Sequence, residues 1–319
     1  MLWKIIKMKK IKYFLIAILG LIVVSAFGGY LYFNEQFTPA DNYLNVKGES
    51  ASIPMTWLSN ESNDHVAQLL PVQIDGIDHI FYMQFDFGSP YTMFYKKPFD
   101  SILSKFTGVQ SVNHTDNSVS LELLLGGLSI SSDNFFLINY GNSIDWNNTS
   151  RPIIIGTIGT DLLEKRIVEM DFQNDVCSFS KSTDIEGFYP FKFKKRRIHL
   201  PAIFNGRKVN LMYDSGTSGY QLVTSKDQWD EFRIHGSAVK KESGNMWGRK
   251  LDVFTTEASA ELEFSGKKLP LSSITHIEGV PGIQRHLMSI SGMDGMLGNK
   301  IFLNHKVILD CKNERFRIE

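Results

Sequence analysis

Val209-Asn210-Leu211-Met212-Tyr213-Asp214-Ser215-Gly216-Thr217-Ser218 is an apolar strand that runs directly into Asp-Ser-Gly-Thr. A carboxylate placed between such a strand and a glycine turn is expected to be partly desolvated and surrounded by backbone N–H donors. A related stretch, residues 80–89, ends in Asp-Phe-Gly-Ser and places Asp86 in the same context. Two such aspartates predict one site built from two halves of the chain.

An internal repeat supports the pairing of the two aspartates. Residues 159–171 align with residues 298–310 at an offset of 139 (298 − 159), and residues 122–127 align with residues 261–266 at the same offset. Asp86 and Asp214 are separated by only 128 positions. The difference of 11 (139 − 128) predicts an insertion of about eleven residues in the second copy, which we place near residues 243–248.

The pattern after residue 65 predicts an all-β fold, because short apolar runs alternate with Gly, Asn and Asp turns. The expected strands of the first copy are residues 66–74, 80–85, 92–95, 118–125 and 128–138. The charged run at residues 191–197 lies between the copies and is predicted to be a connecting strand with solvated charges.

The N-terminal segment has the pattern of a membrane anchor. Residues 4–12 hold five lysines and are followed by 21 residues without charge, 13–33, which are long enough as a helix to span a bilayer core of ~30 Å. The positive-inside rule places the N-terminus in the cytoplasm and the rest of the chain outside it. A signal peptide cleaved near Val24-Ser25-Ala26 is the alternative, and a buried core helix is a third.

Four regions are therefore expected along the chain. They are a membrane anchor or signal peptide at 1–35, a polar stalk at 36–65, a first lobe at 66–185 and a second lobe at 186–319.

Composition excludes several classes of function. Lys plus Arg and Asp plus Glu both number 34, so no global field favours nucleic acid as a partner. Only Cys177 and Cys311 are present, which excludes a disulfide-stapled scaffold and leaves one disulfide between them open. The eight histidines lack the spacing of a metal motif, so neither a metal nor another cofactor is predicted.

Two carboxylates held close together share one proton, because both cannot ionise cheaply. The ionised member can take a proton from water while the protonated member hydrogen-bonds the attacked carbonyl, which amounts to acid–base hydrolysis. Ser89 and Thr217 are expected to donate hydrogen bonds to the carboxylates. Gly88 and Gly216 are expected to let backbone amides approach them.

These motifs resemble those of the pepsin-like, retropepsin-like aspartic proteases, together with two later apolar-apolar-Gly elements, residues 157–159 and 296–298. The resemblance covers about residues 66 to 319. It implies two β-barrel lobes, a catalytic dyad of Asp86 and Asp214 at the bottom of a cleft between them, and apolar-apolar-Gly elements packed beneath the Asp loops. It also implies a peptide or protein substrate. The abundance of Phe, Leu and Ile favours cleavage between bulky apolar residues.

Two features depart from the family pattern. Family members carry Thr or Ser directly after each aspartate, where the hydroxyl bridges the two loops; Ser215 fits this role, whereas Phe87 has no hydroxyl. The loss is on the order of 1 kcal/mol per hydrogen bond. The family's flap tyrosine is also missing from residues 106–121, so Trp247 is a candidate cover for the cleft, or else a surface or packing residue.

Alternative functions follow from these departures. A catalytically inactive binding protein could keep the two-lobed fold for a peptide or glycan ligand, and a membrane-tethered scaffold with a degenerate fold is a weaker alternative. Asp86-Phe87-Gly88 also occurs as the metal-binding triplet of protein kinases, but the chain has no Gly-rich loop and no His-Arg-Asp motif.

Overall fold

The computed structural model describes residues 35, 38–106, 115, 117–148, 151–246, 249–280 and 292–319. It divides the chain into two units, residues 1–41 and 42–319, and the description below concerns the second. In the described part of the chain, no helix is long and apolar enough to cross a membrane. The predicted anchor at residues 13–33 lies outside the described residues.

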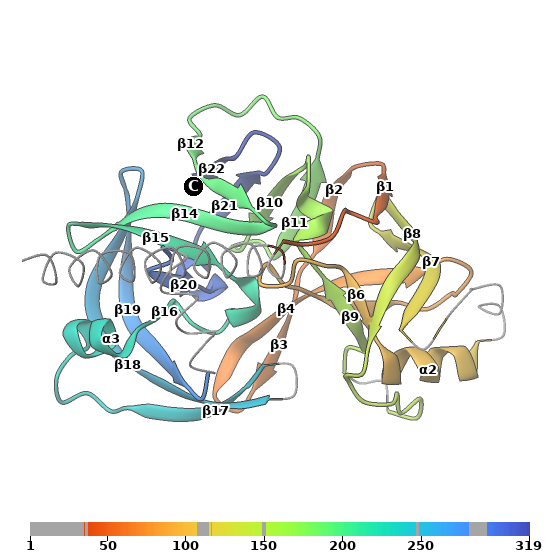
Figure 1. Ribbon diagram of the computed structural model, residues 1–319, viewed down its shortest axis with the longest axis horizontal. Coiled ribbons are helices and arrows are strands. Elements are labelled where there is room, and N and C mark those ends of the chain that lie inside the picture. The colour runs from red at the N-terminus through yellow and green to blue at the C-terminus, as the bar shows by residue number, and fades with distance from the viewer. Residues whose placement is uncertain are drawn as a thin grey trace, which may run out of the picture. The chain divides into compact units, whose positions relative to one another are not determined.

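The first lobe is built on one eight-stranded sheet (Figure 1). In β5, buried Phe81, Met83 and Phe85 alternate with half-buried residues, the period-2 pattern of a strand with one face in the core. The strands are β1 (Asn45–Lys47), β3 (Thr56–Asn60), β4 (Asn63–Ile74), β5 (Phe81–Phe85), β6 (Met93–Tyr95), β7 (Ser118–Leu125), β8 (Leu128–Ile138) and β9 (Ile154–Ile158). The strands expected from β4 to β8 are therefore confirmed, with small shifts at their ends.

The second lobe contains another eight-stranded sheet. Its strands are β13 (Lys192–Lys194), β14 (Arg197–Phe204), β15 (Arg207–Tyr213), β16 (Leu222–Thr224), β17 (Lys240–Met246), β18 (Arg249–Phe264), β19 (Lys267–Glu278) and β20 (Gly295–Leu297). β17 and β18 form a hairpin whose register ends at Met246 opposite Arg249. This hairpin lies where the eleven-residue insertion was predicted, and β17 has no counterpart among the described strands of the first lobe.

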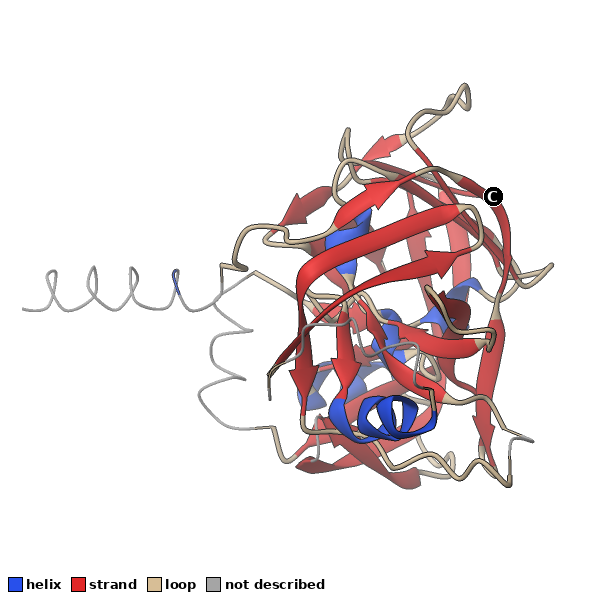
Figure 2. Ribbon diagram, turned by 90° about the vertical axis from the view of Figure 1, so that its right-hand side faces the viewer, coloured by secondary structure: helices blue, strands red, loops and turns tan. Residues whose placement is uncertain are grey.

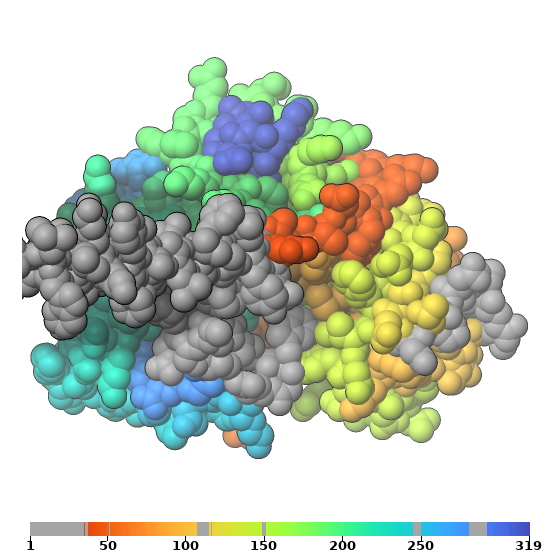
Figure 3. Space-filling model, in the orientation of Figure 1, coloured from red at the N-terminus to blue at the C-terminus, as the bar shows by residue number. Residues whose placement is uncertain are grey.

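A six-stranded sheet joins the two halves of the chain. In it, Glu169 of β10 lies opposite Ile308 of β21, which is its own counterpart in the repeat (308 − 169 = 139). The duplicated segments are therefore related by an approximate twofold axis through this pair. The strands are β2 (Ser50–Pro54), β10 (Ile167–Asp171), β11 (Val176–Ser180), β12 (Tyr189–Pro190), β21 (Lys306–Asp310) and β22 (Arg315–Ile318). Figure 3 shows the dark blue end of the chain at the surface beside the green residues near β12, with which β22 pairs.

Among the described residues the helices are short, as the blue ribbons of Figure 2 show. They are α2 (Lys96–Lys105), α3 (Lys226–Phe232) and the 3₁₀ turns η2 (Thr160–Leu163), η3 (Ser215–Thr217) and η4 (Asn299–Phe302). The sequence analysis missed α2 and α3. For α3 a signal was present, because Ser225 caps the helix by accepting a hydrogen bond from the Gln228 N–H, and Ser-x-x-Gln is a capping-box pattern.

Two further expectations differ from the structure. Residues 45–60, which were assigned to a stalk, contribute β1, β2 and β3, and Ile53 and Met55 lie in the core. The partners of β1 and β2, which are β8 and β11, are distant in sequence and gave no local signal. In the charged run, Arg196 is not solvated but buried against Glu164, with Nε 2.7 Å from Oε1.

Candidate active site

Asp86 follows β5, which pairs in parallel with β9. The Asp86 N–H donates to the Ile158 carbonyl at 3.0 Å, which fixes the start of the Asp loop on the last residue of β9. Gly159 comes next, and a Cβ there would lie 2.4 Å from the Tyr91 carbonyl carbon. Only a glycine allows the loop after Asp86 to approach this closely.

Asp214 is held in the same way in the second lobe. β15 pairs in parallel with β20, and the Asp214 N–H donates to the Leu297 carbonyl at 2.9 Å. A Cβ at Gly298 would lie 2.1 Å from the Thr217 carbonyl oxygen. Each apolar-apolar-Gly element therefore packs directly against its own Asp loop.

The structure brings the Asp86 and Asp214 carboxyl groups close together, each beside the glycine of the other's loop. Each is also bound by its own loop, because the Gly88 N–H donates to Asp86 Oδ1 at 2.8 Å and the Gly216 N–H donates to Asp214 Oδ1 at 2.9 Å. The loops cross closely. A Cβ at Gly88 would lie 2.6 Å from Asp214 Oδ1, and one at Gly216 would lie 2.5 Å from Asp86 Oδ1.

The electrostatics of this pair favour one shared proton. Burial raises the pKa of both carboxyl groups above the ordinary aspartate value, and the charge of Asp86 raises the pKa of Asp214 further. The two carboxyl groups therefore share one proton and titrate as a pair, and Asp86 also accepts from the Gly88 N–H.

Half of the expected clamp between the loops is present. Ser215 Oγ donates to the Phe85 carbonyl at 2.8 Å and accepts from the Phe87 N–H at 2.9 Å. The Phe87 side chain is fully buried, with its ring 4.8 Å from that of Phe85 and 5.0 Å from that of Tyr213, both edge to face. The position that lacks a hydroxyl thus joins the two Asp strands by aromatic packing instead.

The roles expected for two hydroxyl groups are wrong. Ser89 Oγ donates to the Tyr91 carbonyl at 2.8 Å, and Thr217 Oγ1 donates to the Asp214 backbone carbonyl at 2.8 Å. The backbone N–H groups of these residues also donate to backbone carbonyls, that of Ser89 to Asp86 at 3.2 Å and that of Thr217 to Asp214 at 3.0 Å. In a tight turn the side-chain oxygen reaches a nearby carbonyl more easily than the carboxylate.

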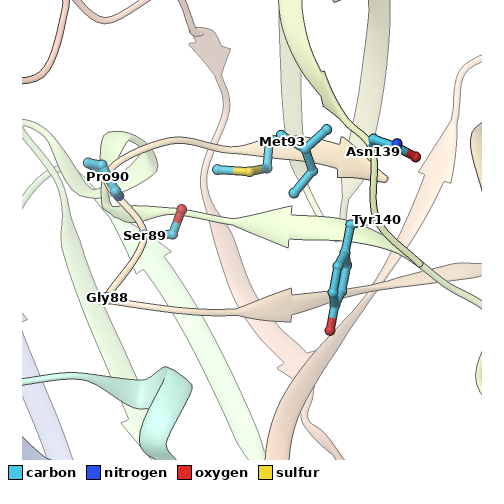
Figure 4. A pocket seen from close by; sticks show the side chains of 7 residues that line it. Gly88, Ser89, Pro90, Met93, Asn139 and Tyr140 are labelled. Carbon is cyan, nitrogen blue, oxygen red and sulfur yellow. The ribbon is translucent and has the colours of Figure 1, made fainter. Parts of the chain in front are cut away.

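A cavity of about 350 Å³ opens beside the Asp86 loop. Figure 4 shows Ser89 and Pro90 on one side of it and Met93 and Tyr140 on the other. Gly88, Ile138 and Asn139 complete the lining. The sequence analysis did not single out Met93, Ile138 or Tyr140, because their convergence depends on the pairing of β6 with β8. Trp247, the candidate cover, lies outside the described residues.

No protein-family model and no curated protein sequence matches this chain. Its fold is similar to that in the crystal structure of an aspartic proteinase from Irpex lacteus, with a TM-score of 0.52 and 12% sequence identity. The match covers 84% of this chain and 96% of that chain. The likeness is one of fold: two β-rich lobes that resemble the pepsin-like aspartic protease fold, as the motifs predicted.

Proposed function

We propose that this chain is an aspartic endopeptidase that hydrolyses peptide bonds with a water molecule activated between Asp86 and Asp214. One observation carries the proposal: two carboxyl groups from related strand ends lie close together, each beside the glycine of the other's loop and each bound by a backbone N–H of its own loop. The fold similarity to an aspartic proteinase supports it.

In this mechanism Asp86 is the base and Asp214 the acid. Asp86 takes a proton from the water, whose oxygen forms the new bond to the peptide carbonyl carbon, while Asp214 donates its proton to the carbonyl oxygen. The C–N bond of the tetrahedral intermediate then breaks, and the proton held by Asp86 passes to the leaving nitrogen. One of the two hydroxyl groups on the former carbonyl carbon gives its proton to Asp214 as the carboxylic acid product forms, and this restores the starting protonation of the two aspartates.

The cavity beside the Asp86 loop supports a large apolar side chain next to the cleaved bond. Its volume of about 350 Å³ lies at the lower end of the usual range for ligand pockets, and Pro90, Met93, Ile138 and Tyr140 give it mainly apolar walls. Because Gly88 lines the cavity and lies beside the Asp214 carboxyl, a side chain in the cavity would hold its own peptide bond near the pair.

The experiment is digestion of a peptide library by the full chain, scanned from about pH 3 to about pH 8 and analysed by mass spectrometry. Wild type should cleave beside bulky apolar residues, and both Asp86→Asn and Asp214→Asn should abolish cleavage. Asp252→Asn is a matched control, because this carboxylate is exposed and pairs with Lys241 at 2.9 Å. If the wild type cleaves no peptide at any pH, the protease proposal is wrong and the binding-protein alternative replaces it.

We also propose that residues 13–33 anchor the enzyme in a membrane with its catalytic unit on the non-cytoplasmic side. The lysine block and the uncharged 21-residue stretch support this orientation. The full chain should sediment with membranes, and protease added from the non-cytoplasmic side should digest the residues after Glu35. A soluble product that begins near Phe27 would show that the segment is a cleaved signal instead.

A further inference from the structure

Asn299 connects three elements beneath the Asp214 loop. It directly follows Gly298 and is fully buried. Its Oδ1 accepts from the Tyr213 hydroxyl at 2.7 Å, and its Nδ2 donates to Ser218 Oγ at 2.7 Å and to Gln68 Oε1 at 2.9 Å. Tyr213 and Ser218 flank Asp214 in sequence, whereas Gln68 belongs to β4 of the first lobe. One amide therefore ties the Asp214 loop to the opposite lobe.

Thr160 has the corresponding place beneath the Asp86 loop. It directly follows Gly159 and is fully buried. Its hydroxyl lies 3.0 Å from the Ser89 carbonyl oxygen and 2.6 Å from the Arg196 carbonyl oxygen. Arg196 lies in the turn between β13 and β14 of the second lobe, and its guanidinium is held by Glu164.

The two positions are equivalent in the repeat, because Thr160 and Asn299 are separated by the same 139 residues as the aligned segments. The Asn299 amide bonds both its own Asp loop and the opposite lobe, and the single Thr160 hydroxyl proton is shared between a carbonyl of its own Asp loop and one of the opposite lobe. Their partners Gln68, Ser218 and Arg196 are all at most 5% exposed, so water has no access to replace a lost bond. The links thus form an approximately twofold pair below the dyad.

We infer that Thr160 and Asn299 are positioning residues that hold the two Asp loops in register, in place of the hydroxyl clamp that Phe87 cannot form. The structural part of this inference stands on the cross-lobe hydrogen bonds alone. Its catalytic consequence rests on the proposed function.

The test compares Thr160→Val and Asn299→Leu with wild type in the full chain. Both variants keep the size of the side chain and remove its hydrogen bonds. Thr256→Val is the matched control, because the buried Thr256 hydroxyl also donates to a backbone carbonyl, that of Ala238 at 3.0 Å, but lies in β18 outside both Asp loops. Thr160→Ser keeps the hydroxyl and should rescue.

The kinetic readout separates positioning from general stability. Misplaced carboxyls should lower kcat by about tenfold to a hundredfold, with KM within about twofold of wild type. Because the interaction of the two carboxylates weakens as they separate, the basic limb of the pH–rate profile should also move to lower pH. Thr256→Val and Thr160→Ser should keep the wild-type kcat and profile.

A second readout needs no catalysis. The Phe87 N–H is bonded across the two Asp loops to Ser215, and the Gly216 N–H is bonded within its own loop to Asp214. Hydrogen exchange measured by mass spectrometry over residues 85–90 and 213–219 should therefore become faster in Thr160→Val. This arm remains informative if the wild type proves inert, and Gln68→Leu replaces Asn299→Leu if that variant fails to fold. Exchange and kinetics equal to those of Thr256→Val would overturn the inference, even if the protease proposal holds.

Discussion

Phe87→Thr restores the hydroxyl expected after the first aspartate, yet the structure predicts that it weakens the protein. The Phe87 ring is fully buried and makes edge-to-face contacts with Phe85 and Tyr213. Truncation of a buried Phe costs about 3–5 kcal/mol. A new hydrogen bond from the Thr hydroxyl would return about 1 kcal/mol. The free energy of unfolding should therefore fall by about 2–4 kcal/mol.

Equilibrium denaturation of the full chain measures this change, with Phe99→Thr as a matched control. Phe99 is equally buried and packs against Phe94 at 5.4 Å, but it lies in α2 rather than in an Asp loop. Both variants should lose stability, and only Phe87→Thr should also lose peptidase rate per folded molecule. A Phe87→Thr variant that is as stable as wild type and more active would refute the idea that packing of the Phe87 ring replaces the hydroxyl clamp. It would show that the missing hydroxyl limits activity.

Two other substitutions probe the site and its support. Gly216→Ala should abolish peptide cleavage, because the new Cβ would lie 2.5 Å from Asp86 Oδ1. Gly206→Ala, which meets no atom within 4 Å but is strained by a φ of +78°, should lose stability and keep the wild-type rate per folded molecule; equal rates for the two variants would contradict the close crossing of the loops. Burial raises the pKa of Asp161 to about 6, so the folded protein keeps a proton that the unfolded chain releases. Its contribution to the free energy of unfolding should fall by about 3 kcal/mol as pH rises from about 3 to about 7, and denaturation across this range should show a flatter profile for Asp161→Asn.

The part of the fold that could be predicted lies where local pattern and duplication coincide. Short apolar runs separated by Gly, Asn and Asp turns located β4 to β8, and the repeat matched Asp86 with Asp214. The change of offset between the copies located the β17–β18 hairpin. Each of these signals can be read from the sequence, either within one segment or by comparison of two copies of that segment.

The part that could not be predicted depends on contacts between segments that share no pattern. β2 pairs with β11 more than one hundred residues later, so nothing local marked it as a strand. The Ser89 hydroxyl turned to a carbonyl rather than a carboxylate because of the geometry of its turn. Thr160 and Asn299 had a signal, since both follow an apolar-apolar-Gly element, but only the packed lobes supply their partners.

The proton shared by the two aspartates can be observed directly by ¹³C NMR titration of the Asp86 and Asp214 carboxyl carbons in the full chain, assigned with the Asn variants. One carboxyl should stay protonated well above the ordinary aspartate range, and Asp86→Asn should lower the pKa of Asp214 because it removes the neighbouring charge. Two carboxyls that titrate independently near the ordinary value of about 3.9, each indifferent to substitution of the other, would contradict the dyad.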